Sequence, residues 1–211
     1  MRAHARHSQR SRQSRQDHQL QRGYSLLELL FVTCAMAVVG SVAVPQLSAA
    51  LDEYRAAGAA RYLSTRIQRT RMEAVNRSAN AALRFVESGA GYSYGVYVDG
   101  NGDGVRTHDI TMSIDKPLGA SERLTDNFSG VDFGLLPALP PVEAGSPPPG
   151  IDPIKLGSSN LLSYTATGTS SSGSLYICGR HGAQYVIRVL GDTGRTRVLK
   201  FDPGSNTWKP L

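Results

Sequence analysis

A single apolar run near the N-terminus constrains this chain of 211 residues more than any other feature. Nearly every residue from Leu26 to Val44 is apolar or small. As an α-helix rising about 1.5 Å per residue, the run would span close to the roughly 30 Å hydrocarbon core of a bilayer. Glu28 is the one charged residue within it. Because a carboxylate in lipid is costly and needs a partner, we predict a membrane helix over residues 24–45 in which this glutamate has a specific role.

The segment before the apolar run carries most of the positive charge. Residues 1–23 contain six arginines and one aspartate, so five units of the net charge of +6 lie there and +1 is left for the rest of the chain. Basic residues on one side of a membrane helix place that side in the cytoplasm. The overall charge is therefore no argument for a nucleic-acid partner. An ordinary secretory signal, cut near the small residues Ser48-Ala49-Ala50, is an alternative, although the run is long for one and contains a glutamate.

The junction between leader and helix forms a specific motif, Gly23-Tyr24-Ser25-Leu26-Leu27-Glu28. It resembles the type III signal of type IV pilins and type II secretion pseudopilins, which often carry a helix-kinking proline where this chain has Pro45. The resemblance implies that a prepilin peptidase removes residues 1–23 and N-methylates Tyr24. It also implies that Glu28 directs assembly by pairing with the α-amine of an adjacent subunit in the bilayer.

The helix is expected to continue after Pro45 as an amphipathic segment over residues 46–80. Apolar or small residues recur there every three or four positions, which predicts one packed stripe. The stripe consists of Leu47, Leu51, Tyr54, Gly58, Leu63, Ile67, Thr70 and Ala74.

Beyond residue 80 the pattern indicates strands. Short apolar or alternating segments predict strands at 81–86 and 92–98, and a β-hairpin formed by 184–190 and 195–201. Residues 137–153 are rich in proline and glycine, which predicts an irregular surface loop. The expected fold is therefore α+β: a long N-terminal helix, membrane-spanning in its first half, packed on an antiparallel β-sheet domain over residues 81–211.

This arrangement agrees with the pilin architecture that the signal implies. Within that superfamily, the helix end RTRMEAVNRSANAALRF and the later segment Gly194-Arg195-Thr196-Arg197-Val198 resemble the GspH/FimT branch. In FimT-type pilins an equivalent Gly-Arg-x-Arg is associated with DNA binding during natural transformation. The resemblance thus implies Arg195 and Arg197 as candidate DNA-binding residues.

Strand geometry gives this candidate a physical basis. Residues two apart on a strand point to one face, so the Arg195 and Arg197 guanidinium groups would project together. Arg188, Lys200 and Lys209 are close enough in sequence to add phosphate contacts. The same hairpin is common to secretion pseudopilins, where its arginines would keep an edge strand soluble, so both interpretations stay open.

The acidic loop offers a weaker candidate for a metal site. Asp99, Asn101 and Asp103 alternate before Gly104, like the front half of a calcium-binding loop. The glutamate that should close such a loop is replaced by Ile110. A tight turn explains the same composition without a metal, and we favour that interpretation.

Nothing in the sequence indicates catalysis or a cofactor. His108 and His181 accompany neither a nucleophile motif nor a phosphate-binding loop. Cys34 and Cys178 lie in separate segments that cannot pair within one chain. We therefore expect a protein that is not an enzyme.

The prediction that combines these observations is a minor pseudopilin of a type II secretion system, a structural subunit of the periplasmic pseudopilus. It would be a single-pass protein of the bacterial inner membrane, with a cytoplasmic N-terminus and a periplasmic C-terminal domain. The resemblance implies three partners: a prepilin peptidase, other minor pilins or pseudopilins, and the inner-membrane assembly platform. The alternative is a FimT-like minor type IV pilin that binds DNA for uptake.

Overall fold

The computed structural model describes residues 23–89 and 91–211. Helix α1 (Leu26–Arg77) is 52 residues long and passes through Pro45 without interruption. The chain divides at Pro45 into two compact units, and each is described by itself. The predicted continuation of the helix beyond the proline is confirmed.

A left-handed residue ends α1. Ser78 has a φ of 49°, and its N–H donates to the carbonyl of Val75 at 3.1 Å. The N–H of Ala79 donates to the carbonyl of Ala74 at 3.2 Å. This pair of bonds is the Schellman arrangement, which satisfies carbonyls that the helix leaves without partners. The helix therefore ends within three residues of the predicted position.

The strands form two antiparallel sheets. Sheet 1 has the order β3-β2-β1-β7, with β4 also paired to β2. Its strands are β1 (Ala81–Ser88), β2 (Gly91–Val98), β3 (Lys116–Pro117), β4 (Glu122–Arg123) and β7 (Leu161–Tyr164). Sheet 2 has the order β11-β10-β9-β8-β5, with β6 also paired to β8. Its strands are β5 (Asp132–Phe133), β6 (Ile154–Lys155), β8 (Gly173–Cys178), β9 (Gln184–Leu190), β10 (Arg195–Asp202) and β11 (Thr207–Pro210).

The predicted hairpin is confirmed as β9 and β10, which pair from Arg195 opposite Leu190 to Lys200 opposite Tyr185. The strands predicted at 81–86 and 92–98 are the paired β1 and β2. Two short helices, α2 (Thr107–Thr111) and α3 (Leu124–Asn127), and several two-residue strands had no counterpart in the prediction. Elements this short are defined by what they pair with, so they leave no periodic pattern in the sequence.

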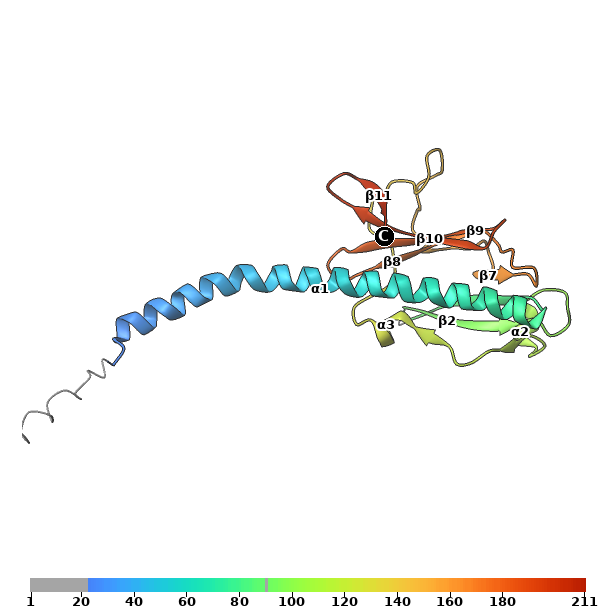
Figure 1. Ribbon diagram of the computed structural model, residues 1–211, viewed down its shortest axis with the longest axis horizontal. Helices are drawn as coiled ribbons and strands as arrows, with labels where there is room; N and C mark the ends of the chain where they lie inside the picture. Colours follow the sequence, from blue (N-terminus) through green and yellow to red (C-terminus); the bar gives the residue numbers. More distant parts are fainter. Residues whose placement is uncertain (1–22, 90) are drawn as a thin grey trace, which may run out of the picture. The chain divides into compact units, whose positions relative to one another are not determined.

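After Pro45, α1 runs between the two sheets (Figure 1). Its side chains reach both of them. Arg66 forms an ion pair with Glu122 of β4 at 2.6 Å, whereas the Ser64 hydroxyl lies 3.1 Å from that of Thr196 on β10. The main core contains residues of α1 and of both sheets. The helix is therefore the middle layer of this unit, not a cover on one sheet.

The burial pattern of α1 corrects three of the eight positions of the predicted stripe. Leu63, Ile67, Thr70 and Ala74 are buried as expected. Leu47, Leu51 and Tyr54 are exposed, and in their place the helix buries an aspartate and four alanines: Asp52, Ala56, Ala57, Ala59 and Ala60. The prediction missed these alanines because the stripe was identified mainly from large apolar residues. The small side chain of alanine nevertheless lets two sheets approach one helix closely, which favours it at these positions.

The proline-rich loop covers part of the face of sheet 2 that points away from α1. Residues 137–153, all of which the structure describes, contain neither helix nor strand, as predicted. The loop is held by the Trp208 indole, whose N–H donates to the carbonyl of Pro140 at 3.0 Å. Beneath it, Tyr176, Val186 and Leu199 form a small apolar cluster. The loop is thus a packed part of the unit.

Candidate functional sites

The predicted processing site lies at the start of the described chain. A Cβ at Gly23 would meet no described atom within 4 Å, and Tyr24 is 77% exposed. The fold therefore places no packing demand on either residue. The rest of the predicted leader, residues 1–22, lies outside the described residues.

Glu28 occupies the first turn of α1. Its backbone N–H donates to the hydroxyl of Ser25 at 3.1 Å, which is one half of a capping box. Its carboxylate lies on an exposed part of the helix. The local role of this position in starting the helix needs only its backbone, so the carboxylate is available for an intermolecular role.

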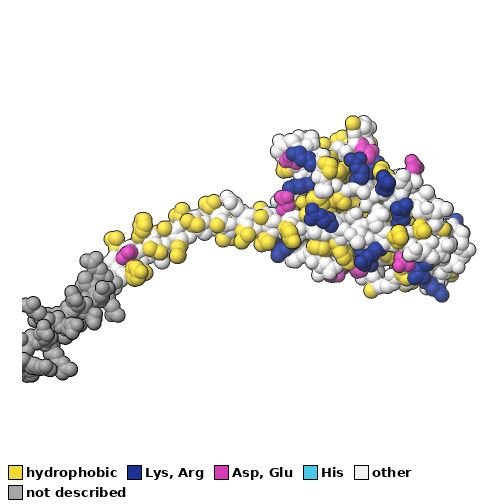
Figure 2. All heavy atoms as spheres, viewed as in Figure 1, with side chains coloured by type: hydrophobic (Ala, Val, Ile, Leu, Met, Phe, Trp, Pro, Cys, Tyr) yellow, Lys and Arg dark blue, Asp and Glu magenta, His cyan; other side chains and the backbone are white. Residues whose placement is uncertain are grey.

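The segment Leu26–Pro45 belongs to a helix that is long and apolar enough to cross a membrane. Its large apolar side chains are exposed, and Figure 2 shows them along this part of the helix. Exposed apolar surface on this scale is costly in water. The segment therefore needs lipid or other apolar helices around it.

The Gly-Arg-Thr-Arg segment divides into structural and solvent-facing positions. Gly194 is buried with a φ of 61°, and a Cβ there would lie 2.6 Å from the carbonyl oxygen of Gly168. The Arg71 Nε–H donates to that same carbonyl at 2.9 Å. Thr196 faces α1, where Gln68 donates to its hydroxyl at 3.2 Å. The glycine and the threonine therefore have structural reasons for their identity.

Arg195 and Arg197 are exposed and share one face of the strand, as predicted. That face points away from α1, because Thr196 between them faces the helix. Two of the three further cations do not join them. Lys200 pairs with Glu53 of α1, and Lys209 lies opposite Lys200 in the sheet and pairs with Asp202. Both lysines are on the other face of sheet 2, because neighbouring residues of a strand alternate. The expectation that they extend the arginine surface is wrong.

Arg188 is the third cation, and it does lie on the arginine face, directly opposite Arg197. Its Nε–H and Nη2–H donate to the two carboxylate oxygens of Glu143, each at 3.3 Å. Its Nη1–H donates to the Ser174 hydroxyl at 3.0 Å. The structure therefore brings three arginines to one face and neutralises one of them.

The acidic loop uses its carboxylates internally. Asp99 accepts hydrogen bonds from the backbone N–H groups of Asn101, Gly102 and Gly104 and from the side-chain amide of Asn80. Burial raises the pKa of Asp99, but these bonds outweigh burial and leave it below its usual value. Asp103 pairs with Arg106 at 2.8 Å. This geometry is that of an Asx-type turn and supports the favoured interpretation.

Sequence reasoning missed Asp52. This aspartate of α1 is 4% exposed, and its two carboxylate oxygens accept the backbone N–H groups of Arg180 and His181, each at 2.8 Å. A Cβ at Gly179 would lie 2.5 Å from one of these oxygens. The carboxylate therefore anchors the β8–β9 turn to the helix. The available signal was an aspartate close to several alanines in the predicted amphipathic helix.

The remaining reactive side chains are dispersed. Cys34 is exposed on α1, and Cys178 is a half-buried free thiol whose pKa is raised by burial and by Asp52. His108 and His181 are exposed. Among residues 23–89 and 91–211, no group of three or more His, Cys, Asp or Glu side chains is placed to hold a metal ion.

Comparison with known proteins identifies a family. The model of the type II transport protein GspH family matches residues 59–194, which is more than half of the chain. A pilin-like protein of Thermus thermophilus, PilA1, is 42% identical over 83 residues, or 38% of this chain and 49% of that protein. The chain thus spans about half the length of this curated relative. No solved structure is significantly similar.

Proposed function

This chain belongs to the GspH family of type II transport proteins, and we propose that it is a minor pseudopilin of a type II secretion system, a structural subunit of the periplasmic pseudopilus. The observation that carries the proposal is the composition of α1. Its first part exposes apolar side chains over the length of a bilayer, and its second part is the middle layer of a folded unit. One helix thus connects an apolar segment suited to the membrane with a folded unit.

These features suit a subunit that waits in the inner membrane and enters a filament of similar helices. Removal of the leader by a prepilin peptidase would leave Tyr24 with a free α-amine, four residues before Glu28. A carboxylate and an amine from neighbouring subunits would compensate each other in lipid and set the register of insertion. The folded unit would then lie in the periplasm, as the basic leader predicts.

The test is assembly of the Glu28→Ala variant in cells. Membrane insertion should persist, because the change makes the helix more apolar. Cross-linking into filaments should fall, because the neighbour's amine loses its partner. The matched control is Glu73→Ala, which removes a charge from α1 that pairs with Arg77 of the same helix. Equal assembly of the Glu28→Ala variant, the control and the wild type would show that the proposed pairing is wrong.

One observation favours the second candidate, a minor pilin that binds DNA for uptake. Arg195 and Arg197 are exposed on one face, and the fold uses their neighbours Gly194 and Thr196 without using the two guanidinium groups in any described ion pair. Two such cations at a spacing of two residues could contact phosphates without reading sequence.

Titration of the membrane-extracted protein in nonionic detergent against labelled duplex DNA separates the two candidates, provided that residues 1–23 have been removed, because their six arginines would bind phosphates themselves. The secretion proposal predicts no binding at low salt. DNA uptake predicts binding that weakens with salt, and the Arg195→Gln/Arg197→Gln variant should flatten the logarithmic salt slope by about 2, since each lost phosphate contact contributes about 0.9. Arg55→Gln/Arg61→Gln, which removes two exposed arginines of α1, is the control for total charge.

A further inference from the structure

A row of cations crosses the outer face of sheet 2 from strand to strand. Lys155 of β6 lies opposite Ser174 of β8, Ser174 lies opposite Arg188 of β9, and Arg188 lies opposite Arg197 of β10. Directly opposite residues of an antiparallel sheet share a face, so all four side chains project to the same side. We call this set the basic row.

The basic row carries more positive charge than the fold neutralises. Like charges directly opposite each other destabilise a sheet, and the Arg188–Arg197 pair is such a contact. Glu143 compensates Arg188. Within the part of the chain that the structure describes, Lys155 and Arg197 form no ion pair. A surface of this kind favours a negatively charged partner.

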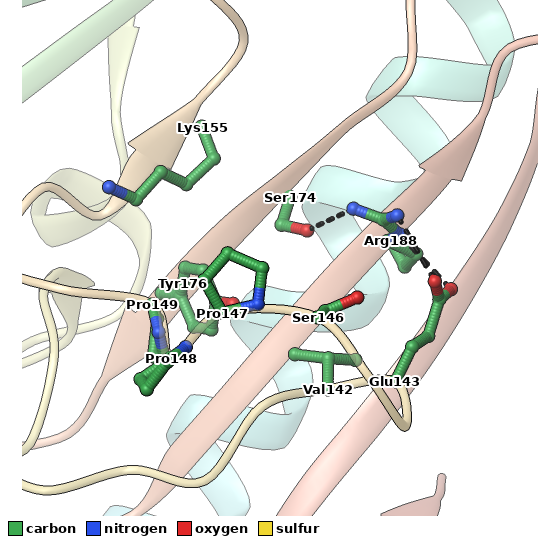
Figure 3. Close-up of a pocket in the computed structure, with 10 residues that line it drawn as sticks. All are labelled: Val142, Glu143, Ser146, Pro147, Pro148, Pro149, Lys155, Ser174, Tyr176 and Arg188. Atoms are coloured by element: carbon green, nitrogen blue, oxygen red, sulfur yellow. Dashed lines mark hydrogen bonds and ion pairs between the residues drawn. The ribbon is translucent and has the colours of Figure 1, made fainter.

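The proline-rich loop turns part of the basic row into a pocket. A cavity of about 340 Å³ lies between this loop and the strands. Its walls include Pro147, Pro148 and Pro149 from the loop and Tyr176 from β8, with Lys155 and Arg188 also in the lining. Figure 3 shows these prolines beside Tyr176, and Arg188 held between Ser174 and Glu143. The cavity therefore combines an apolar wall with two cations.

Glu143 shows which chemistry the site accepts. It is an exposed residue of the loop, and its carboxylate binds the guanidinium of Arg188 through two parallel hydrogen bonds. A planar guanidinium held by a serine hydroxyl is well arranged for a carboxylate. Because the contact is exposed and weak, an external carboxylate could replace it.

We propose that the basic row and its pocket bind an acidic, extended peptide segment of a partner protein, and that Glu143 occupies the Arg188 site until such a segment displaces it. The apolar wall would hold the carbon chains between the acidic groups. A DNA duplex suits the site less well, because it is too wide to enter a cavity of this size and has no use for a proline wall. The proposal rests on the proposed function in that the partner is taken to be a protein.

The test measures fluorescence anisotropy of a labelled eight-residue peptide of alternating glutamate and alanine with the membrane-extracted protein in nonionic detergent. The protein lacks residues 1–23, because their six arginines would bind acidic probes themselves. A peptide with glutamine in place of glutamate and a labelled 20-base-pair duplex serve as the other probes. We expect the glutamate peptide alone to bind. Glu143→Gln should tighten its binding about threefold to fivefold, because the internal competitor is lost. Glu87→Gln, which removes one exposed charge from sheet 1, should have a smaller effect.

Arg188→Gln in the Glu143→Gln background should weaken peptide binding at least to the wild-type level, and Lys155→Gln should weaken it independently. Equal binding of the glutamine peptide, equal effects of Glu143→Gln and Glu87→Gln, or binding of the duplex in place of the peptide would overturn the proposal. Filament cross-linking of the same variants keeps the two hypotheses apart. If the wild type assembles into filaments but does not bind the peptide, the proposed peptide site is wrong. If the wild type does not assemble, the proposed function is wrong.

Discussion

The anchoring role of Asp52 leads to a quantitative prediction about stability. In the Asp52→Ala variant the backbone N–H groups of Arg180 and His181 lose the carboxylate that accepts them at 2.8 Å. A hydrogen bond to a charged group contributes about 1.5–3 kcal/mol, so the two together set an upper range of about 3–6 kcal/mol. Water can reach both donors, because Arg180 and His181 are exposed, and the variant no longer buries a charge. We therefore expect a loss of about 2–3 kcal/mol in the free energy of unfolding.

Urea unfolding of the full-length protein in nonionic detergent measures this loss. Trp208, the single tryptophan, lies on β11 of sheet 2 and reports on the sheet that the aspartate anchors. Glu53→Ala is the matched control, because this neighbouring exposed residue forms an ion pair with Lys200, which is worth less than about 1 kcal/mol. The loss of stability in the Asp52→Asn variant should lie between those of Asp52→Ala and Glu53→Ala, because asparagine keeps one acceptor oxygen but not the charge.

Hydrogen exchange supplies the second readout. The amides of Arg180 and His181 should lose protection in the Asp52→Ala variant, while those in the middle of β1 and β2 should keep it. A stability loss no larger than that of Glu53→Ala, or a loss that leaves both amides protected, would refute the argument that Asp52 holds the turn.

Three further predictions concern other parts of the chain. The protein extracted from membranes should begin at N-methylated Tyr24, as intact mass measurement would show, and a start near residue 50 would indicate ordinary secretion. Gly194→Ala should cost at least about 2 kcal/mol, because it adds a clash to the strain of a left-handed residue, whereas Gly182→Ala adds the strain alone; urea unfolding of both variants compares them. The pKa of Asp99 in the folded protein lies below its unfolded value of about 3.9. The stability that its carboxylate contributes is therefore fully present above the unfolded pKa and is lost as the pH falls through the folded pKa. The backbone amides bound to Asp99 should accordingly lose exchange protection in acid, and an Asp99→Asn variant that showed the same pH dependence would contradict this origin.

Local patterns were enough to predict the elements themselves. The apolar run, the turn Gly191-Asp192-Thr193-Gly194 between the two hairpin strands, and the proline-rich stretch each act over a few neighbouring residues. The long helix, the terminal hairpin and the irregular loop were therefore all predictable. The GspH family was recognisable from other short motifs: Gly23–Glu28, the helix end RTRMEAVNRSANAALRF and the segment Gly194–Val198. Each of these features depends on spacing along the chain, which a sequence displays directly.

Predictions that depend on contacts between residues far apart in the sequence were wrong in two places. The predicted stripe through Leu47, Leu51 and Tyr54 failed, because the buried residues of α1 begin only at Asp52 and the buried arc of a helix depends on what surrounds it. Likewise, Lys200 and Lys209 were expected to extend the arginine surface, whereas strand pairing places them on the opposite face.

The sequence by itself determined a helix long and apolar enough to cross a membrane, the Gly23–Glu28 motif from which processing is predicted, and the alternation of Arg195 and Arg197, because each is a property of consecutive residues. Only the tertiary structure decided that Asp52 anchors a turn 128 residues away and that Lys155, Arg188 and Arg197 share one row. The reason is physical: the register between strands and the layering of sheets on a helix are set by the packing of the whole unit, and no local segment contains that information.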